Sequence, residues 1–122
     1  MPTMDLTRDN FETIVTDNPM VIVDFWAPWC GPCRGFAPVF ENASQAHPDV
    51  VFARVNTDSE QELAGSFNIR SIPTLMVFRE KVILFQQAGA LPASALEQVL
   101  SRTKLLDMAE VRKEIAERDP AP

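Results

Sequence analysis

The sequence predicts an α/β fold with a mixed central β-sheet, helices on both faces and a helical extension at the C-terminus. Apolar strand patterns alternate with helical patterns, two strand patterns near residue 80 are close enough to form a hairpin, and a charged helical pattern follows residue 103. Alternating strands and helices favour parallel pairing, whereas a hairpin requires antiparallel pairing, so the sheet should be mixed. With 122 residues, 46% of them hydrophobic, the chain can form one core.

The first elements are a short strand, a helix and a buried strand. Residues 4–6 have a strand pattern, and Thr7 is a suitable N-cap for the helix that follows. The apolar residues on one face of that helix are Phe11, Ile14 and Val15. The next run, MVIVDFWA at residues 20–27, is apolar at nearly every position, which is typical of a central strand covered on both faces.

The alternation continues through the middle of the chain. A helical pattern covers residues 31–46, and Pro38 should kink this helix because proline lacks a backbone N–H. A second buried strand is expected over residues 50–58, followed by a short helix over residues 59–67.

Two more strands and a helix complete the predicted domain, residues 1–103. The strands cover residues 74–80 and 82–89, and their connection at Glu80-Lys81 lacks the easy positive φ of glycine, so we expect a longer or different turn. Pro92 opens the next helix. The residues expected on its core-facing stripe are Leu96, Val99, Leu100 and Thr103.

Residues 104–122 are predicted to form a C-terminal helical extension. Its apolar stripe consists of Leu105, Met108, Val111 and Ile115. At ~100° per residue, this stripe is centred roughly 110° from the preceding one, so one straight helix cannot bury both. We expect the chain to break near Thr103 and a separate helix to fold back. The alternative is a long helix whose second stripe mediates self-association or binds a partner.

Charge and hydropathy exclude several classes of partner. The net charge of −6 argues against a nucleic acid or an anionic membrane surface as the main partner. No apolar segment reaches the ~18 residues of a membrane span, and the start of the chain has no signal-peptide pattern. The missing signal-peptide pattern favours the cytoplasm. We also expect a monomer, with self-association through the C-terminal helix as the alternative.

Both cysteines lie in WAPWCGPC, residues 26–33, where they could form a structural bridge, part of a metal site or a redox pair. A bridge that closes two intervening residues constrains the unfolded chain little. A structural zinc site needs four ligands, and the chain offers two cysteines and one histidine, so no metal site is expected. His47 is expected to be an exposed loop residue rather than the base of a cysteine hydrolase.

The redox interpretation follows from the place of the motif between a strand and a helix. Cys30 should lie at the helix N-terminus, where free N–H groups and the helix dipole lower a thiol pKa from ~8.5 toward neutrality, so Cys30 is the expected nucleophile. Cys33 follows about one turn later and further inside, where it can resolve a mixed disulfide. Asp24 in VIVDFW should be buried with a raised pKa, which suits proton transfer. Alternatively, backbone amides could satisfy Asp24 at a strand end.

The stretches VDFWAPWCGPC, RGFAP and SIPT resemble the thioredoxin family in order and spacing, over roughly residues 4–103. The resemblance implies the thioredoxin fold and the reduction of protein disulfides through Cys30 and Cys33. It also implies that a thioredoxin reductase returns the electrons and that no bound cofactor is needed. Gly31-Pro32 is similar to the reductant branch, because oxidases and isomerases usually carry a histidine there. An interaction module that binds partners without turnover is the rival interpretation.

The resemblance also implies roles for single residues. Asp24 would take the proton of Cys33, and Pro73 would be a cis-proline that leaves the backbone of Ile72 free to pair with a target segment. Trp26 would mainly support the site by packing. Arg54 stands where thioredoxins commonly carry lysine, and its fork of donors could hold Asp24 more firmly ionised. The expected target-binding patch consists of Trp29, Gly31, Pro32, Ile72, Pro73 and the segment Ala88 to Ala90, which contains Gly89.

Overall fold

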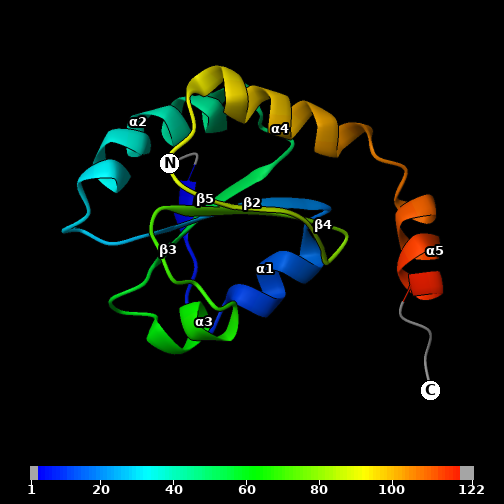
Figure 1. Ribbon diagram of the computed structural model, residues 1–122, viewed down its shortest axis with the longest axis horizontal. Helices are drawn as coiled ribbons and strands as arrows, with labels where there is room; N and C mark the ends of the chain where they lie inside the picture. The colour runs from blue at the N-terminus through cyan, green and yellow to red at the C-terminus, as the bar shows by residue number, and fades with distance from the viewer. Residues whose placement is uncertain (1–2, 119–122) are drawn as a thin grey trace.

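The computed structural model of the chain describes residues 3–118, in which strands and helices follow the predicted order (Figure 1). The strands are β1 (Thr3–Asp5), β2 (Met20–Trp26), β3 (Val51–Asn56), β4 (Thr74–Arg79) and β5 (Val82–Ala88). The helices are α1 (Phe11–Asp17), α2 (Gly31–Ala46), α3 (Gln61–Ser66), α4 (Ala93–Leu105) and α5 (Met108–Arg118).

The strands form one sheet in the order β1-β3-β2-β4-β5. β3 pairs in parallel with both β1 and β2, whereas β4 runs antiparallel to β2 and β5. Helices α2 and α4 cover one face, and α1 and α3 cover the other (Figure 1). The predicted mixed sheet with helices on both faces is therefore confirmed.

The side chains of β2 point alternately into two hydrophobic cores, one on each face of the sheet. Val21, Val23 and Phe25 belong to the core under α1 and α3, whereas Ile22 packs with Phe36 of α2 in the other core. Side chains alternate between the faces of a strand, so Asp24 and Trp26 follow Ile22 on the α2 face. An acidic side chain is thereby placed beneath the first turns of α2, at the end of the sheet where the cysteine motif begins.

The predicted N-cap at Thr7 is wrong, because α1 begins at Phe11 with Asn10 in the capping position. The side chain of Asn10 accepts a hydrogen bond from the backbone N–H of Thr7 at 2.7 Å, and the Thr7 carbonyl accepts from the N–H of Phe11 at 3.0 Å. Thr7 therefore begins the turn that precedes the helix. Asparagine competes well for such turns because its side chain bonds to nearby backbone.

The connection between β4 and β5 also differs from the prediction. Arg79 pairs with Val82, so Glu80 and Lys81 alone form a two-residue turn, and both have positive φ, 51° and 70°. A loop of two residues between antiparallel strands favours positive φ at both positions, and contacts from elsewhere in the chain add to it. The N–H of Glu80 donates to the carbonyl of Pro19 at 2.8 Å, and the carboxylate of Glu80 accepts from Arg112 of α5 at 2.7 Å.

Replacing Lys81 with glycine should stabilise the protein, because a side chain at φ 70° is strained and glycine is not. We expect a gain of about 1 kcal/mol in the free energy of unfolding, measured by denaturant titration. Glu80→Gly is the matched control. It relieves similar strain but removes the carboxylate that Arg112 binds, so its gain should be smaller. Equal gains would show that the contact with Arg112 contributes nothing.

Helix α4 continues past Thr103 to Leu105, so the break lies at Leu106 and Asp107, slightly later than predicted. The predicted core stripe of α4 is confirmed, with Leu96, Leu100 and Thr103 buried. Arg79 of β4 donates to the carbonyls of Thr103, Lys104 and Leu106 and so satisfies the end of α4. The carboxylate of Asp107 then accepts from the N–H of Ala109 at 3.0 Å and caps the start of α5.

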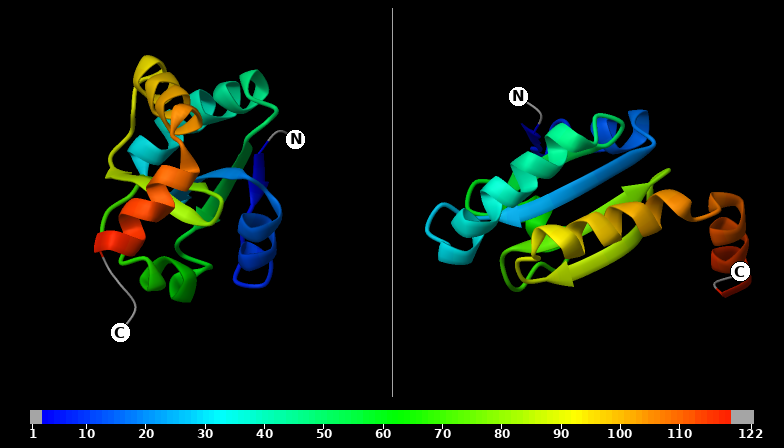
Figure 2. Two further views of the ribbon diagram at one scale, coloured as in Figure 1. Left: turned by 90° about the vertical axis from the view of Figure 1, so that its right-hand side faces the viewer. Right: turned by 90° about the horizontal axis from the view of Figure 1, so that it is seen from above.

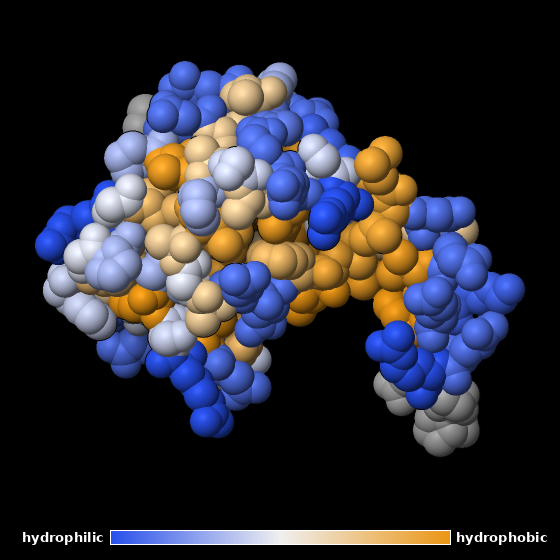
Figure 3. Space-filling view, turned by 45° about the horizontal axis from the view of Figure 1, so that its top comes forward, coloured by the Kyte–Doolittle hydropathy of each residue, from blue (hydrophilic) through white to orange (hydrophobic). Residues whose placement is uncertain are grey.

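The tail forms a separate helix, as the two stripes predict, but the expected apolar stripe of the tail is divided between buried and exposed residues. Met108 is buried and Arg112 binds Glu80, whereas Leu105 is 84% exposed and Ile115 is also exposed. Figure 2 shows α5 turning away at the end of α4. In Figure 3, apolar surface continues from α4 onto α5 and lines the hollow between α5 and the rest of the molecule.

His47 is not the exposed loop residue that was expected. It follows α2, and its N–H donates to the carbonyl of Ala43 at 3.1 Å. Its imidazole lies 2.9 Å from the carboxylate of Glu97 and 2.8 Å from the ammonium of Lys104, both on α4. His47 therefore connects the two helices that cover one face of the sheet.

Candidate active site

The two cysteines lie where β2 ends and α2 begins. Cys30 has extended backbone (φ −84°, ψ 112°) and occupies the N-cap of α2, while Gly31 and Pro32 form the first helical positions. Proline is well placed there because its missing N–H would have no helical partner. The backbone N–H of Cys33 donates to the sulfur of Cys30 at 3.2 Å. This donor and the positive end of the helix dipole would stabilise a thiolate on Cys30.

Cys30 and Cys33 form a disulfide, with their Cα atoms 5.2 Å apart. Cys33 is completely buried, and Cys30 retains 4% of its exposed surface. Cys30 is therefore the outer cysteine, although it is far less exposed in the disulfide than the sequence suggested. The reason is that both cysteines form a small cluster with Ala27, against which Trp26 and Ile72 pack.

A loop from the other half of the sheet approaches the disulfide. The Ile72–Pro73 peptide bond is cis, as the resemblance implied, and the carbonyl oxygen of Ile72 lies 3.8 Å from the sulfur of Cys30. The N–H of Gly89, which has a φ of 104°, donates to the carbonyl of Pro73 at 2.8 Å. Hydrogen bonding thus connects Gly89 to the proline loop beside the cysteines.

The expected target-binding residues differ in their exposure. Trp29, Gly31, Pro32 and Gly89 are exposed, Ile72 is half-buried and Pro73 is buried. Trp29 is 68% exposed, which is unusual for so large an apolar side chain. The structure places these residues around Cys30, from three separate segments of the chain.

Sequence reasoning did not identify Asp58, which contacts Trp29. The indole N–H of Trp29 lies 3.2 and 3.1 Å from the two carboxylate oxygens of Asp58. Asp58 follows the end of β3, the parallel neighbour of β2, so both residues lie at the same edge of the sheet. That position, in a polar run directly after a buried strand, was the available signal.

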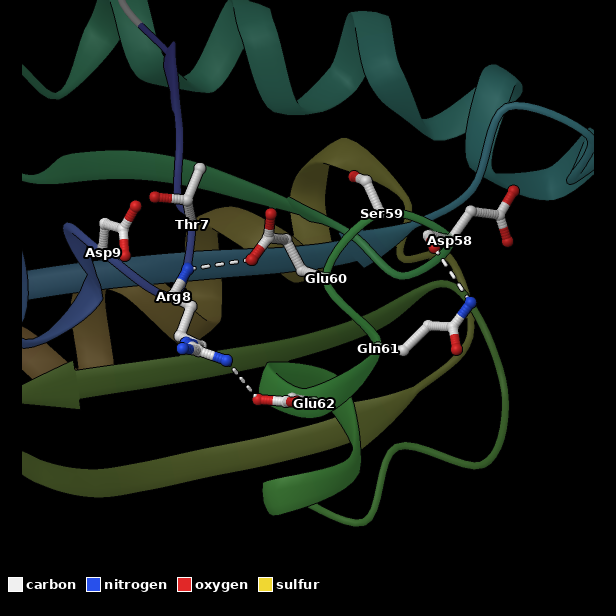
Figure 4. Close-up of a pocket in the computed structure, with 8 residues that line it drawn as sticks. All are labelled: Thr7, Arg8, Asp9, Asp58, Ser59, Glu60, Gln61 and Glu62. Carbon is white, nitrogen blue, oxygen red and sulfur yellow. Dashed lines mark hydrogen bonds and ion pairs between the residues drawn. The ribbon is translucent and has the colours of Figure 1, made fainter.

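Asp58 also belongs to a surface hollow of about 550 Å³ beside the site (Figure 4). The lining residues are Thr7, Arg8, Asp9 and Asp58 to Glu62. Arg8 is satisfied within it, because its backbone N–H donates to Glu60 at 2.8 Å and its guanidinium pairs with Glu62 at 2.6 Å. The hollow is therefore an acidic surface next to Trp29.

Asp24 is fully buried, and neither of its carboxylate oxygens has a hydrogen-bond partner among the described residues. Burial raises the pKa of Asp24 from 3.8 to about 6, and the positive charge of Arg54 partly opposes this increase. Burial has the larger effect because removing a carboxylate from water disfavours its charged form. Asp24 can therefore gain or lose a proton near neutral pH.

Arg54 does not form the fork-like pair with Asp24 that the sequence suggested. Its Nε lies 3.5 Å from Oδ2 of Asp24 without a hydrogen bond, and its guanidinium carbon lies 4.1 Å from the centre of the Trp26 ring. Trp26 thus packs against the cluster that contains both cysteines and also lies beside Arg54. Its supporting role stays a prediction.

Within residues 3–118, no group of three or more histidine, cysteine, aspartate or glutamate side chains is arranged to hold a metal ion. In the same part of the chain, every helix is too short or too polar to cross a membrane.

The sequence and the fold were compared with known proteins. Residues 2–102 match the family model for thioredoxin. The chain is 54% identical to putative thioredoxin 2 of Streptomyces coelicolor over 116 residues, which cover 95% of this chain and 87% of the relative. It is 44% identical to thioredoxin of Alicyclobacillus acidocaldarius over 100 residues, covering 81% and 95% of the two chains.

Solved structures agree with the sequence matches. Thioredoxin of Plasmodium falciparum superimposes with a TM-score of 0.76 at 35% identity, covering 82% of this chain and 97% of the other. Oxidised mitochondrial thioredoxin 3 of Saccharomyces cerevisiae gives a TM-score of 0.76 at 28% identity, covering 82% and 94%. Because sequence, fold and the disulfide at the start of α2 all agree, the chain belongs to the thioredoxin family and is a thiol–disulfide oxidoreductase whose redox pair is Cys30 and Cys33.

Proposed function

We propose that Cys30 is the attacking thiol and Cys33 the resolving thiol in the reduction of protein disulfides. The observation that carries this assignment is the position of Cys30 at the N-cap of α2, where the N–H of Cys33 donates to its sulfur. The Cys30 thiolate attacks one sulfur of the target disulfide, forming a mixed disulfide and releasing the other target sulfur as a thiolate. The Cys33 thiolate then attacks the sulfur of Cys30. The target leaves fully reduced, and the Cys30–Cys33 disulfide forms.

Asp24 is proposed to take the proton of Cys33 before this second attack. Its burial on the α2 face and its pKa of about 6 support the role, because a base works best near the operating pH. The proton passes to Asp24 as Cys33 becomes a nucleophile and leaves when the next cycle begins. The burial of Cys33 supports the order in which the two thiols react, because a target can reach Cys30 but cannot reach Cys33 directly.

The target is proposed to bind over Trp29, Gly31, Pro32 and Gly89, with the backbone of Ile72 as an additional strand-like contact. Pro73 is buried, so it contributes by shaping the loop rather than by direct contact. Exposed apolar surface beside a reactive disulfide supports this assignment.

Recycling requires electrons from outside the chain. A thioredoxin reductase that uses NADPH returns the Cys30–Cys33 disulfide to the dithiol, and no bound cofactor takes part. A reductant of this kind requires a compartment in which that supply is maintained, so we assign it to the cytoplasm.

Replacing Cys33 with serine should trap targets as mixed disulfides, because the first attack remains possible and the second does not. The measurement is non-reducing gel electrophoresis after incubation with insulin whose disulfides are intact. Dithiothreitol should release the adduct. The order of the two thiols can also be tested in the reduced wild type. One equivalent of iodoacetamide at pH 7 should alkylate Cys30 before Cys33, and peptide mapping identifies the labelled residue. Preferential labelling of Cys33 would reverse the assignment.

Residues 1–103 are proposed to form the catalytic domain of a monomer, with residues 104–122 as a helical extension. Burial of Met108 and the pairing of Arg112 with Glu80 support an extension that stabilises its own chain. Exposure of Leu105, Leu106 and Ile115 leaves self-association as the alternative.

Truncation after Thr103 should leave insulin reduction intact but lower stability. Loss of the buried Met108 side chain alone should cost about 2–3 kcal/mol, measured by denaturant unfolding. Met108→Ala should reproduce the part of this loss that comes from Met108, whereas Ile115→Ala, at an exposed position, should not. The truncation also removes Lys104 and Leu106, whose carbonyls accept from Arg79. Sedimentation tests the oligomeric state. A full-length dimer that dissociates on truncation would contradict the monomer.

A further inference from the structure

Asp24, Arg54 and Trp26 form a connected cluster beneath the first turn of α2. Asp24 and Arg54 are direct neighbours across the parallel strands β2 and β3, and Trp26 lies two residues beyond Asp24 on the same face. Four buried polar atoms of this cluster lack a hydrogen-bond partner among the described residues: both carboxylate oxygens of Asp24, Nε of Arg54 and Nε1 of Trp26. Unsatisfied buried polar atoms are rare in folded proteins, so their concentration here requires an explanation.

The position of Arg54 explains why the oxygens of Asp24 and Nε of Arg54 remain without partners. A guanidinium and a carboxylate normally pair through two parallel hydrogen bonds of about 2.8 Å. Here only a 3.5 Å approach from Nε to Oδ2 is made, while the guanidinium carbon lies 4.1 Å from the centre of the indole ring of Trp26. A cation at this distance from a tryptophan face is attracted to the ring. Held over the ring in this position, the guanidinium approaches Asp24 through Nε at 3.5 Å and donates no hydrogen bond to either carboxylate oxygen.

Few other charged groups compete for Asp24. On β4, its neighbour across the sheet is the apolar Leu75, and α2 contributes Cys33 and the apolar Phe36 to this side of the molecule. On β1, Asp5 is the register partner of Arg54 and is exposed. Among the groups that face Asp24, Arg54 is therefore the one cation that can control its ionisation.

We propose that Trp26 is a positioning residue, which holds the Arg54 guanidinium against its ring and so prevents a bidentate ion pair with Asp24. A bidentate pair would fix Asp24 as a carboxylate and stop it from carrying a proton. The contact with Trp26 keeps the cation close but incompletely engaged, in agreement with a pKa that burial still raises to about 6. The consequence for turnover rests on the proton-transfer role proposed above for Asp24.

The test is the titration of Asp24 in the oxidised protein, followed by carbon-13 NMR of its carboxyl group. Trp26→Leu should release Arg54 to pair fully with Asp24 and lower the titration midpoint by about one pH unit or more. Trp26→Phe keeps an aromatic face and should lower it by less. The same Trp26→Leu change should have little effect when Arg54 is already methionine, because the effect of Trp26 passes through the guanidinium.

An unchanged midpoint in Trp26→Leu would overturn the inference. So would an equal decrease in the wild-type and Arg54→Met backgrounds, since Trp26 would then act by excluding water. If Trp26→Leu does not fold, Trp26→Phe in the two backgrounds gives the same comparison with a smaller shift. In the wild type, ring currents should also move the side-chain proton signals of Arg54 upfield, and their absence would contradict the contact.

The role of Asp24 itself is tested separately. If Asp24→Asn resolves mixed disulfides at the wild-type rate while the Trp26 variants move the midpoint, the proton-transfer role fails and the positioning of Arg54 stands. If Asp24→Asn is slow but the midpoint stays fixed in the Trp26 variants, the proton-transfer role stands and this inference fails.

Discussion

Cys30→Ser should reduce insulin disulfides no faster than dithiothreitol alone. Cys33 is completely buried and the outer surface of the pair belongs to Cys30, so without the Cys30 sulfur no thiol remains that a target disulfide can reach. A serine hydroxyl cannot replace it, because disulfide exchange requires a thiolate. The measurement is the rate of insulin precipitation at pH 7 with limiting dithiothreitol.

Cys33→Ser is the matched control for this loss. It removes the same number of thiols but should still form a covalent adduct with insulin, which Cys30→Ser should not. Strong insulin reduction by Cys30→Ser would contradict the mechanism. A wild-type protein that binds targets but neither forms adducts nor reduces insulin would favour the rival interpretation, an interaction module without turnover.

Local patterns in the sequence were sufficient to predict the order of elements and the place of the cysteines. The strand MVIVDFWA is followed at once by WCGPC and a helical pattern, so Cys30 had to lie near a helix N-terminus. The cis bond before Pro73 came only from the resemblance, because nothing in the local sequence distinguishes it from an ordinary trans bond.

Two of the predictions that failed involve contacts between distant segments. The turn at Glu80-Lys81 has positive φ because the pairing of Arg79 with Val82 leaves a loop of two residues. Pro19 and Arg112 contact this turn from distant segments, and neither contact is visible in the turn itself. Helix α4 ends later than its periodicity suggests because Arg79, from β4, binds its last carbonyls. Propensity is a weak guide where tertiary contacts of this kind act.

In the active site too, features that depend on local sequence could be predicted, and features that depend on distant contacts could not. Burial of Asp24 could be predicted from its position in an apolar strand, and the raised pKa followed from burial. The orientation of Arg54 could not be predicted, because it depends on the ring of Trp26 on the neighbouring strand. The contact between Trp29 and Asp58 was also missed, since it joins residues 29 positions apart.

Asp24→Asn should stabilise the oxidised protein, with the gain depending on pH. Because the folded state raises the pKa of Asp24 from 3.8 to about 6, ionisation opposes folding. Below the unfolded value both states bind the proton and no penalty exists. The penalty grows as pH rises between these two pKa values and is complete above the folded value, where it amounts to about 3 kcal/mol. Arg54 loses its counter-charge in the variant, so this figure is an upper limit.

Denaturant unfolding of wild type and Asp24→Asn between pH 3.5 and pH 8 measures this difference directly. The two curves should meet at the acid end, and the variant should be more stable above pH 6.

The same substitution should slow resolution of mixed disulfides at pH 7 by roughly 10- to 100-fold, because Cys33 loses its base. A stability difference that does not vary with pH would contradict the raised pKa. An unchanged resolution rate across pH 6 to 8 would limit Asp24 to a structural role, even if the stability curves separate as expected.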